Sequence, residues 1–127
     1  MNKPWLKNYD DNVPLSLEYP DITLGELLMQ KSAEHPENIA TTYNDIDLTY
    51  RDINEKANGF AHALLDLGVK KGDRVAFVLP NSPTYVIAYF GVMKIGAVVV
   101  NLNVMSHGPE LTKFLNVPIA VMILNCL

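Results

Sequence analysis

The run Gly68-Val69-Lys70-Lys71-Gly72-Asp73-Arg74-Val75 joins a long amphipathic helix to a buried strand, and this junction constrains the fold most strongly. Apolar residues between positions 50 and 67 recur at helical spacing, and the first glycine of the run suits a left-handed helix end. Val75 to Leu79 is continuously apolar, as expected of a strand covered on both faces. A second helix, 83–95, and a second apolar strand, 97–100, follow. This order predicts a parallel α/β sheet.

The same alternation continues toward the end of the sequence. After a loop at 101–108, residues 109–116 have the pattern of a short helix, and Ile119 to Leu124 has that of a third buried strand. We therefore expect an α/β fold with a parallel βαβαβ sheet flanked by helices. Because the last strand is an apolar run at the end of the sequence, we interpret residues 22–127 as a partial, unfinished domain.

Residues 1–21 are expected to form an extended N-terminal arm. Prolines fix φ and remove backbone donors, which favours an extended arm rather than a helix. The prolines of this segment are Pro4, Pro14 and Pro20. Two alternatives stay open for the arm. It lies on the surface of its own domain, or it docks Trp5, Leu6 and Tyr9 on a partner or a further domain.

Two capping boxes mark helix starts after the arm. Thr23 with Glu26 and Thr49 with Asp52 both have the T-x-x-[E/D] spacing in which each residue serves the other's free backbone N–H. The first predicts a helix ending near His35-Pro36, whose apolar face comprises Ile22, Leu24, Leu27, Leu28 and Met29. The second predicts the helix 50–67, in which close packing would explain Gly59.

Asn44-Asp45 stands between two short strand patterns, 39–43 and 46–49. A two-residue loop of this composition favours a tight turn with two left-handed residues. The sequence therefore predicts a β-hairpin between the two helices.

The helix 83–95 is apolar on nearly every side, and only Lys94 is charged. Ser82 is placed to cap it, and Pro83 suits the first helical position, where no donor is needed. A helix of this kind must be buried. We expect the sheet on one side of it and other protein on the other.

Composition excludes several classes of protein. Of the 127 residues, 49% are hydrophobic and 19% charged, which excludes a disordered or fibrous chain. The net charge of −4 and the lack of a basic run argue against nucleic-acid binding. The single Cys126 fits a reducing compartment, the first residues lack the apolar core of a signal peptide, and no membrane span is expected. These features favour a cytoplasmic protein.

Three predicted strands end in amide side chains: Asn81, Asn101 with Asn103, and Asn125. Ligands of open α/β sheets bind outside the carboxyl ends of the strands, so these amides could line a binding crevice. The alternative, which we favour, is that they terminate strands and satisfy loop backbone.

The other candidates for chemistry have structural interpretations. His35, His62 and His107 lie far apart in the sequence without ligand partners nearby, so surface positions are expected rather than a metal site. The spacing from Gly68 to Gly72-Asp73 is not that of a phosphate loop and predicts a turn into the strand. We expect Lys70, Lys71 and Arg74 to form a solvated basic rim, and Cys126 to be an unactivated thiol. The sequence thus assigns no catalytic, cofactor-binding or metal-binding residue.

Taken together, the motifs resemble the N-terminal part of the AMP-forming acyl-CoA synthetases, the adenylate-forming superfamily. The similarity extends from about Pro4 to Leu124, and the opening Pro4-Trp5-Leu6-Lys7-Asn8-Tyr9 with Val13-Pro14 is similar to the long-chain fatty-acid–CoA ligases. The remaining motifs, in order, are Leu48-Thr49-Tyr50-Arg51-Asp52-Ile53, the Gly68–Val75 run, Leu79-Pro80-Asn81, and Gly96-Ala97-Val98-Val99-Val100-Asn101.

The resemblance implies an enzyme that adenylates a fatty acid with ATP and Mg²⁺ and then transfers the acyl group to coenzyme A. Negative charge that builds up on phosphate requires backbone donors, cations and a metal ion. In this family these come from segments downstream of the similarity found here. The resemblance therefore implies no catalytic residue within this sequence.

Three hypotheses follow. The first is the N-terminal piece of a long-chain acyl-CoA synthetase that is inactive alone and holds no cofactor. The second is a self-associating scaffold, a homodimer or higher oligomer, since unshielded apolar surface drives association. The third is a binder of a small ligand at the Asn-rimmed strand ends.

Overall fold

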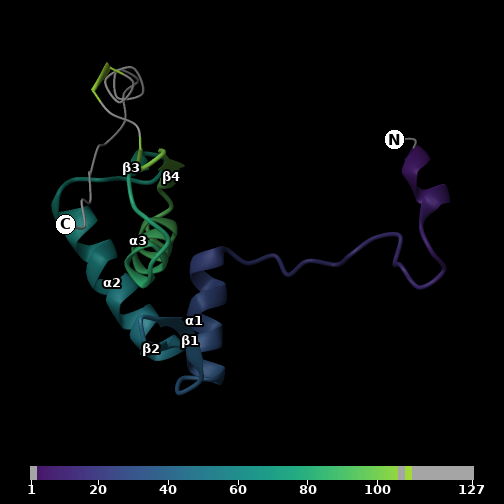
Figure 1. Cartoon of the computed structure of the whole chain (residues 1–127), viewed down its shortest axis with the longest axis horizontal. Helices are drawn as coiled ribbons and strands as arrows, with labels where there is room; N and C mark the ends of the chain where they lie inside the picture. Colours follow the sequence, from purple (N-terminus) through teal and green to yellow (C-terminus); the bar gives the residue numbers. More distant parts are fainter. Residues whose placement is uncertain (1–2, 106–107, 110–127) are drawn as a thin grey trace.

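The computed structural model describes residues 3–105 and 108–109, and Figure 1 shows their arrangement. The elements in chain order are a 3₁₀ helix (Pro4–Asn8), α1 (Leu24–Glu34), β1 (Ile39–Tyr43), β2 (Ile46–Thr49), α2 (Tyr50–Asp66), β3 (Arg74–Phe77), α3 (Pro83–Lys94) and β4 (Val98–Asn101). No helix of the described part is long and apolar enough to cross a membrane. The third strand expected at 119–124 and the short helix expected at 109–116 lie outside the described residues, apart from Pro109.

The N-terminal arm projects away from the folded body (Figure 1). It is not extended throughout, because Pro4–Asn8 forms a 3₁₀ helix, which corrects the sequence-based expectation. Pro4 stands at the start of this helix, where a missing donor costs nothing. Trp5 and Tyr9 are 52% and 43% exposed. Among the described residues, the arm therefore extends away from the folded body rather than along its surface.

Both predicted capping boxes are confirmed. Thr23 N donates to Glu26 Oε2 at 2.7 Å, and Glu26 N donates back to Thr23 Oγ1 at 3.2 Å. The Thr49–Asp52 pair makes the same two bonds at 2.9 and 3.1 Å. These boxes set the starts of α1 and α2 at the predicted residues.

The predicted apolar face of α1 is wrong in part. Leu28 is buried, but Leu24 and Met29 are 46% and 54% exposed. The buried side of α1 instead includes Gly25, which lies against the end of α3; a Cβ atom there would come within 3.2 Å of Lys94 Cα. The small residue lets the two helices approach closely. Helix α1 therefore packs against the rest of the fold through a narrow row of buried residues.

The predicted hairpin is confirmed. Asn44 and Asp45 both have positive φ, 49° and 60°, as a two-residue turn of this kind requires. β1 pairs antiparallel with β2, and an irregularity separates Ile39 from Thr41 in the register.

The sheet expected from the Gly68–Val75 junction is also confirmed. β3 and β4 pair in parallel, from Arg74 opposite Val98 to Phe77 opposite Asn101. Gly68 and Gly72 have φ of +85° and +88°, so the turn needs its glycines. β4 is less buried than predicted, since Val98 is 47% exposed. Among the described residues β4 has one neighbouring strand, which leaves part of it uncovered.

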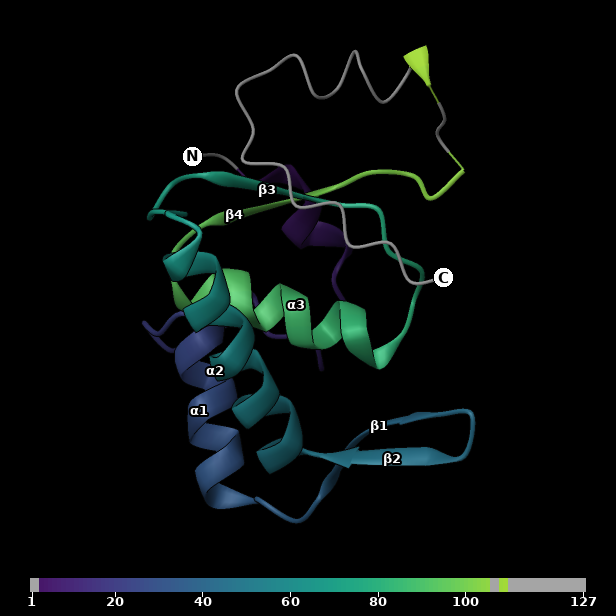
Figure 2. The same ribbon diagram turned by 90° about the vertical axis from the view of Figure 1, so that its left-hand side faces the viewer.

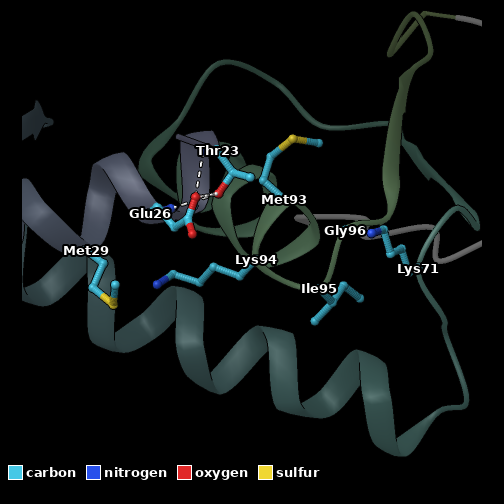
Figure 3. A pocket seen from close by; sticks show the side chains of 9 residues that line it. Thr23, Glu26, Met29, Lys71, Met93, Lys94, Ile95 and Gly96 are labelled. Atoms are coloured by element: carbon cyan, nitrogen blue, oxygen red, sulfur yellow. Dashed lines mark hydrogen bonds between the residues drawn. The ribbon is translucent and has the colours of Figure 1, made fainter. Parts of the chain in front are cut away.

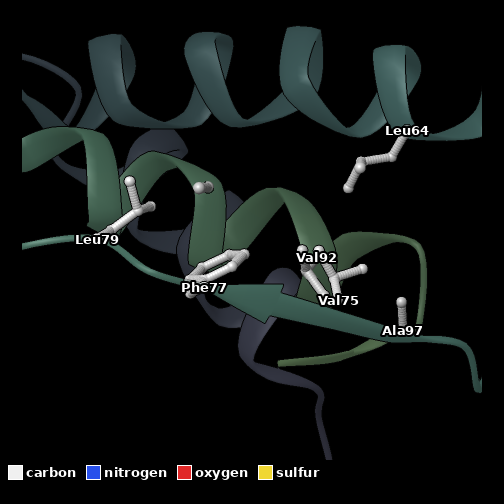
Figure 4. Packing of buried hydrophobic residues seen from close by; sticks show 7 residues of the cluster. Leu64, Val75, Phe77, Leu79, Val92 and Ala97 are labelled. Atoms are coloured by element: carbon white, nitrogen blue, oxygen red, sulfur yellow. The ribbon is translucent and has the colours of Figure 1, made fainter. Parts of the chain in front are cut away.

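Helix α3 lies between the β3–β4 sheet and the helices α1 and α2 (Figure 2), as its all-apolar sequence predicts. The main core forms where these layers meet. Figure 4 shows the packing of this core. Its buried members are Leu64, Val75, Phe77, Leu79, Ala88, Val92 and Ala97. Ser82 occupies the cap position of α3, but its side chain makes no capping hydrogen bond, which corrects that expectation.

Two helical glycines have opposite surroundings. A Cβ atom at Gly91 would come within 2.7 Å of Phe60 Cδ1, so α2 and α3 touch through this glycine. A Cβ atom at Gly59 would meet no described residue within 4 Å. The expectation that close packing explains Gly59 is therefore wrong, and the close approach belongs to Gly91.

Candidate functional site

A crevice lies at the carboxyl ends of β3 and β4. Because the strands are parallel, both end at the same edge of the sheet. The crevice has a volume of about 460 Å³, and its lining includes Phe77, Pro80, Asn81, Tyr85, Asn101 and Val104. The structure therefore brings Asn81 and Asn101 to one site, as the ligand interpretation of these amides requires.

The other two amides behave differently. Asn103 does not line the crevice; its Oδ1 accepts a hydrogen bond from Met105 N at 2.9 Å. This is the loop-backbone role that the sequence favours for such residues. Asn125 lies outside the described residues.

Sequence reasoning missed Tyr85, which organises the crevice. Its hydroxyl donates to Asn101 Oδ1 at 3.0 Å, and its ring meets Phe77 edge-on with the ring centres 5.6 Å apart. Tyr85 also stacks on Tyr89, one turn along α3. The available signal was spacing: Tyr85 follows Asn81 by four residues, across the strand-to-helix turn.

The chemistry of this crevice is that of neutral hydrogen-bonding groups. Amides and a phenol can orient a ligand, but cleaving or forming a bond needs a nucleophile, an acid–base pair or a cation. The side chains lining it in the described part of the chain supply hydrogen bonds and an aromatic wall, and none is a carboxylate, imidazole, thiol or amine. The site is suited to binding or positioning.

A second hollow, of about 440 Å³, lies where α1 begins and α3 ends (Figure 3). Two of its three charged side chains, Glu26 and Lys94, already serve the fold, and the third is Lys71. The Glu26 carboxylate accepts from both the backbone N–H and the hydroxyl of Thr23, and these bonds hold the pKa of Glu26 below its usual value. Lys94 Nζ donates to Asn54 Oδ1 at 2.8 Å, and burial lowers the pKa of Lys94.

The remaining sequence candidates are spread over the surface or lie outside the described residues. His35 and His62 are exposed, and within residues 3–105 and 108–109 no three potential metal ligands of the His, Cys, Asp or Glu type cluster. His107 and Cys126 lie outside the described residues. Lys70 and Lys71 are exposed and Arg74 is half-buried.

The Gly72-Asp73 segment is the turn that the sequence predicts. Asp73 Oδ2 accepts from Lys70 N at 2.8 Å, and Gly72 N donates to Gly96 O at 2.9 Å. The second bond ties the start of β3 to the start of β4. The turn's role is therefore to align the two strands whose far ends form the crevice.

Comparison with known proteins identifies the class. The family model described as "AMP-binding enzyme" matches residues 28–125, and the chain belongs to this family. The match contains α2, α3 and both strands of the parallel sheet.

Individual relatives show which proteins of this family the chain is similar to. A long-chain-fatty-acid–CoA ligase of Bacillus subtilis is 41% identical over 101 residues, which cover 80% of this chain and 18% of the relative. The fatty acyl CoA synthetase of Mycobacterium tuberculosis superposes with a TM-score of 0.69 at 36% identity, over 73% of this chain and 19% of that one. The N-terminal subdomain of Klebsiella oxytoca NpsA superposes with a TM-score of 0.69 at 29% identity, over 74% of this chain and 25% of that one.

The chain thus resembles the N-terminal part of the AMP-forming acyl-CoA ligases. It spans about a fifth of the length of the curated relatives it matches.

Proposed function

We propose that this chain is the N-terminal section of a long-chain fatty-acid–CoA ligase. The observation that carries the proposal is the 41% identity to the Bacillus subtilis ligase over 101 residues. In the whole enzyme we expect a fatty acid to be adenylated with ATP and Mg²⁺, and the acyl group then to pass to coenzyme A. The single cysteine of the sequence, Cys126, supports a cytoplasmic location.

The role we assign to this section is structural support and positioning. The core supports the Asn81–Asn101 edge, because Phe77 at the end of β3 and Leu79 just after it are buried and also line the crevice. Phosphoryl chemistry needs cations and donors that converge on phosphate. The strand-end crevice instead offers neutral amides and a phenol, so the groups that act on phosphate would come from the rest of the ligase.

The proposal predicts that the chain alone is inactive. The test is fatty-acid- and CoA-dependent release of AMP and pyrophosphate from ATP by the purified chain, with the Bacillus subtilis ligase as the positive control. We expect release at the background level. Turnover by the chain that depends on both fatty acid and CoA would contradict the assignment of catalysis to the remainder of the enzyme.

A second candidate is a self-associating module, and the arm favours it. Leu15, Leu17 and Tyr19 are 61%, 61% and 80% exposed on a segment that projects from the body. Burial of apolar side chains drives association. The arm is a better candidate for this than α3, because Val92 and Ala88 of α3 are already buried within the chain.

Light scattering coupled to sizing, over a range of concentrations, tests this candidate. A homodimer or higher homo-oligomer that dissociates when Leu15, Leu17 and Tyr19 are all changed to Ser would support association through the arm. A monomer at every concentration would exclude it. Ala33→Ser, an exposed change on α1, is the control for effects of added polarity.

A further inference from the structure

The hollow between the start of α1 and the end of α3 (Figure 3), called here the α1–α3 hollow, carries an excess of positive charge. Its charged lining residues are Lys71, Lys94 and Glu26. The Glu26 carboxylate is held by its two bonds to Thr23. Within the described part of the chain, neither lysine forms an ion pair. An anionic group that enters the hollow would supply the missing counter-charge.

Lys71 is the more accessible of the two lysines. It is exposed, and its side chain lies against Gly96, where a Cβ atom would come within 3.0 Å of Lys71 Cγ. Lys94 Nζ instead donates to Asn54 Oδ1, and Lys94 is half-buried. An ammonium group has three donors, so hydrogen-bonding capacity remains on both. We therefore expect Lys71 to make the main contact with an anionic group.

The rest of the hollow offers apolar surface. Met29, Met93 and Ile95 contribute to its lining, and Met29 is 54% exposed. Methionine side chains are flexible and polarisable, so they adapt to the shape of an apolar partner. The hollow therefore matches a segment that combines carboxylates with apolar side chains.

The N-terminal arm has this composition. No basic residue occurs between positions 8 and 21, and the acidic ones are Asp10, Asp11, Glu18 and Asp21. Apolar residues alternate with proline or polar residues further along the arm, and all of them are exposed. They are Val13, Leu15, Leu17 and Tyr19. Alternate side chains of an extended segment share one face, so these residues can form a single apolar row.

We propose that the arm of one copy of this chain docks in the α1–α3 hollow of a second copy. The apolar row of the arm contacts Met29 and Met93, and an arm carboxylate pairs with Lys71. The charges of the two surfaces are complementary, and complementary charges favour the association of two such surfaces. This inference rests on the self-association proposed above and names the surface that receives the arm.

The arm is poorly placed to reach the hollow of its own copy. It leaves the body at Thr23, which itself lines the hollow, and runs away from the body (Figure 1). The arm would have to reverse direction immediately before Thr23. Pro20 opposes such a reversal, because proline fixes its own φ and favours an extended conformation at the preceding residue, Tyr19.

Light scattering coupled to sizing, on the full chain at low and at high salt, is the first test. We expect association that rises with protein concentration and weakens at high salt, because salt screens the paired charges. A monomer at every concentration would overturn both the docking and the self-association on which it rests.

Lys71→Glu reverses the charge of the accessible lysine. It should weaken association by about three- to tenfold. Lys70→Glu is the matched control and should leave association unchanged, since Lys70 is exposed but does not line the hollow. Circular dichroism establishes that both variants are folded. Association that Lys71→Glu leaves unchanged, or that both variants weaken equally, would refute docking in this hollow while self-association itself stands.

A charge swap between copies shows whether the arm crosses from one copy to another. The arm variant carries Asp10→Lys, Asp11→Lys and Glu18→Lys, and alone it should associate as weakly as Lys71→Glu. In an equimolar mixture of these two variants, each arm meets a hollow of opposite charge on the other copy. We expect mixing to restore association to near the wild-type strength. A mixture no stronger than either variant alone, the result also expected if each arm folds back onto its own copy, would overturn the proposal.

Discussion

Gly91 on α3 faces Phe60 on α2 so closely that a side chain at Gly91 has no room. A Cβ atom there would lie 2.7 Å from Phe60 Cδ1 and 3.1 Å from the backbone oxygen of Ala57. The ring can shift, but the backbone oxygen of a helix cannot move without distorting it. This contact fixes how α2 and α3 pack, and α3 in turn supports the sheet edge that carries Asn81 and Asn101.

Gly91→Ala should therefore destabilise the fold. Overpacking of this kind lowers the free energy of unfolding by about 1–3 kcal/mol. Urea unfolding followed by circular dichroism measures it. Gly59→Ala on α2 is the matched control, because a Cβ atom there meets no atom of the described part of the chain within 4 Å. This control should raise the free energy of unfolding by about 0.5–1 kcal/mol. Equal effects of the two changes would contradict the packing described.

Val92→Asp should prevent folding. Val92 is 0% exposed in the main core. An unpaired carboxylate there lowers the free energy of unfolding by several times as much as a typical point mutation does. Val98→Asp makes the same chemical change at a residue that is 47% exposed, and should cost less than about 1 kcal/mol. Circular dichroism and thermal unfolding compare them. A folded Val92→Asp protein as stable as the wild type would mean that α3 is not buried.

Asn54→Ala should destabilise the junction of α2 with the end of α3. Asn54 accepts the 2.8 Å hydrogen bond from Lys94, and without it a partly buried ammonium group loses its partner. We expect a loss of about 1–2 kcal/mol in the free energy of unfolding. Asn58→Ala, an exposed site one turn along the same helix, should have little effect. Equal losses at both sites would show that the bond to Lys94 contributes nothing.

Stability should decrease in acid, in part through Asp52. The backbone N–H and then the hydroxyl of Thr49 donate to this carboxylate and lower its pKa from the ordinary value of 3.8. The folded state therefore holds the charged form more strongly than the unfolded state. The resulting stabilisation is complete above pH 3.8 and is lost as the pH falls through the lowered folded-state pKa.

Asp52→Asn should remove that contribution, so the free energy of unfolding should fall less steeply between neutral pH and about pH 3. Part of the slope should remain, because the pKa values of Glu26 and Glu34 are lowered as well. Asn58→Ala on the same helix, which changes no titratable group, is the control and should leave the slope unchanged. Asp52→Asn with the wild-type slope would refute the pH argument.

Local signals in the sequence specify much of the fold. Few residue types can make the hydrogen bonds of the two capping boxes. Few can likewise adopt the positive φ angles of the Asn44-Asp45 turn and of the glycines in the β3 turn. Periodicity likewise predicts α2 and the buried β3. These features depend on neighbours within a few positions, which is why the sequence alone reveals them.

Features that depend on distant contacts were harder to predict. Whether the helices approach closely at Gly59 or at Gly91 depends on where α2 crosses α3. The sequence of neither helix alone indicates that crossing point. The exposure of Leu24, Met29 and Val98 depends on which neighbours cover them. The sequence placed Asn81 and Asn101 at one edge through topology, whereas Tyr85 enters the crevice through a side-chain orientation that topology does not specify.

The most direct test of the ligase assignment is a chimera. The section of the Bacillus subtilis ligase that this chain matches is replaced by the residues of this chain, and fatty-acid-dependent formation of the CoA thioester is measured. A parallel chimera that carries Val92→Asp serves as the unfolded control. If the chain is the N-terminal section of such a ligase, the chimera should retain activity within about tenfold of the parent. A chimera that is folded, with the same thermal unfolding midpoint as the parent ligase, but forms no thioester would contradict the assignment.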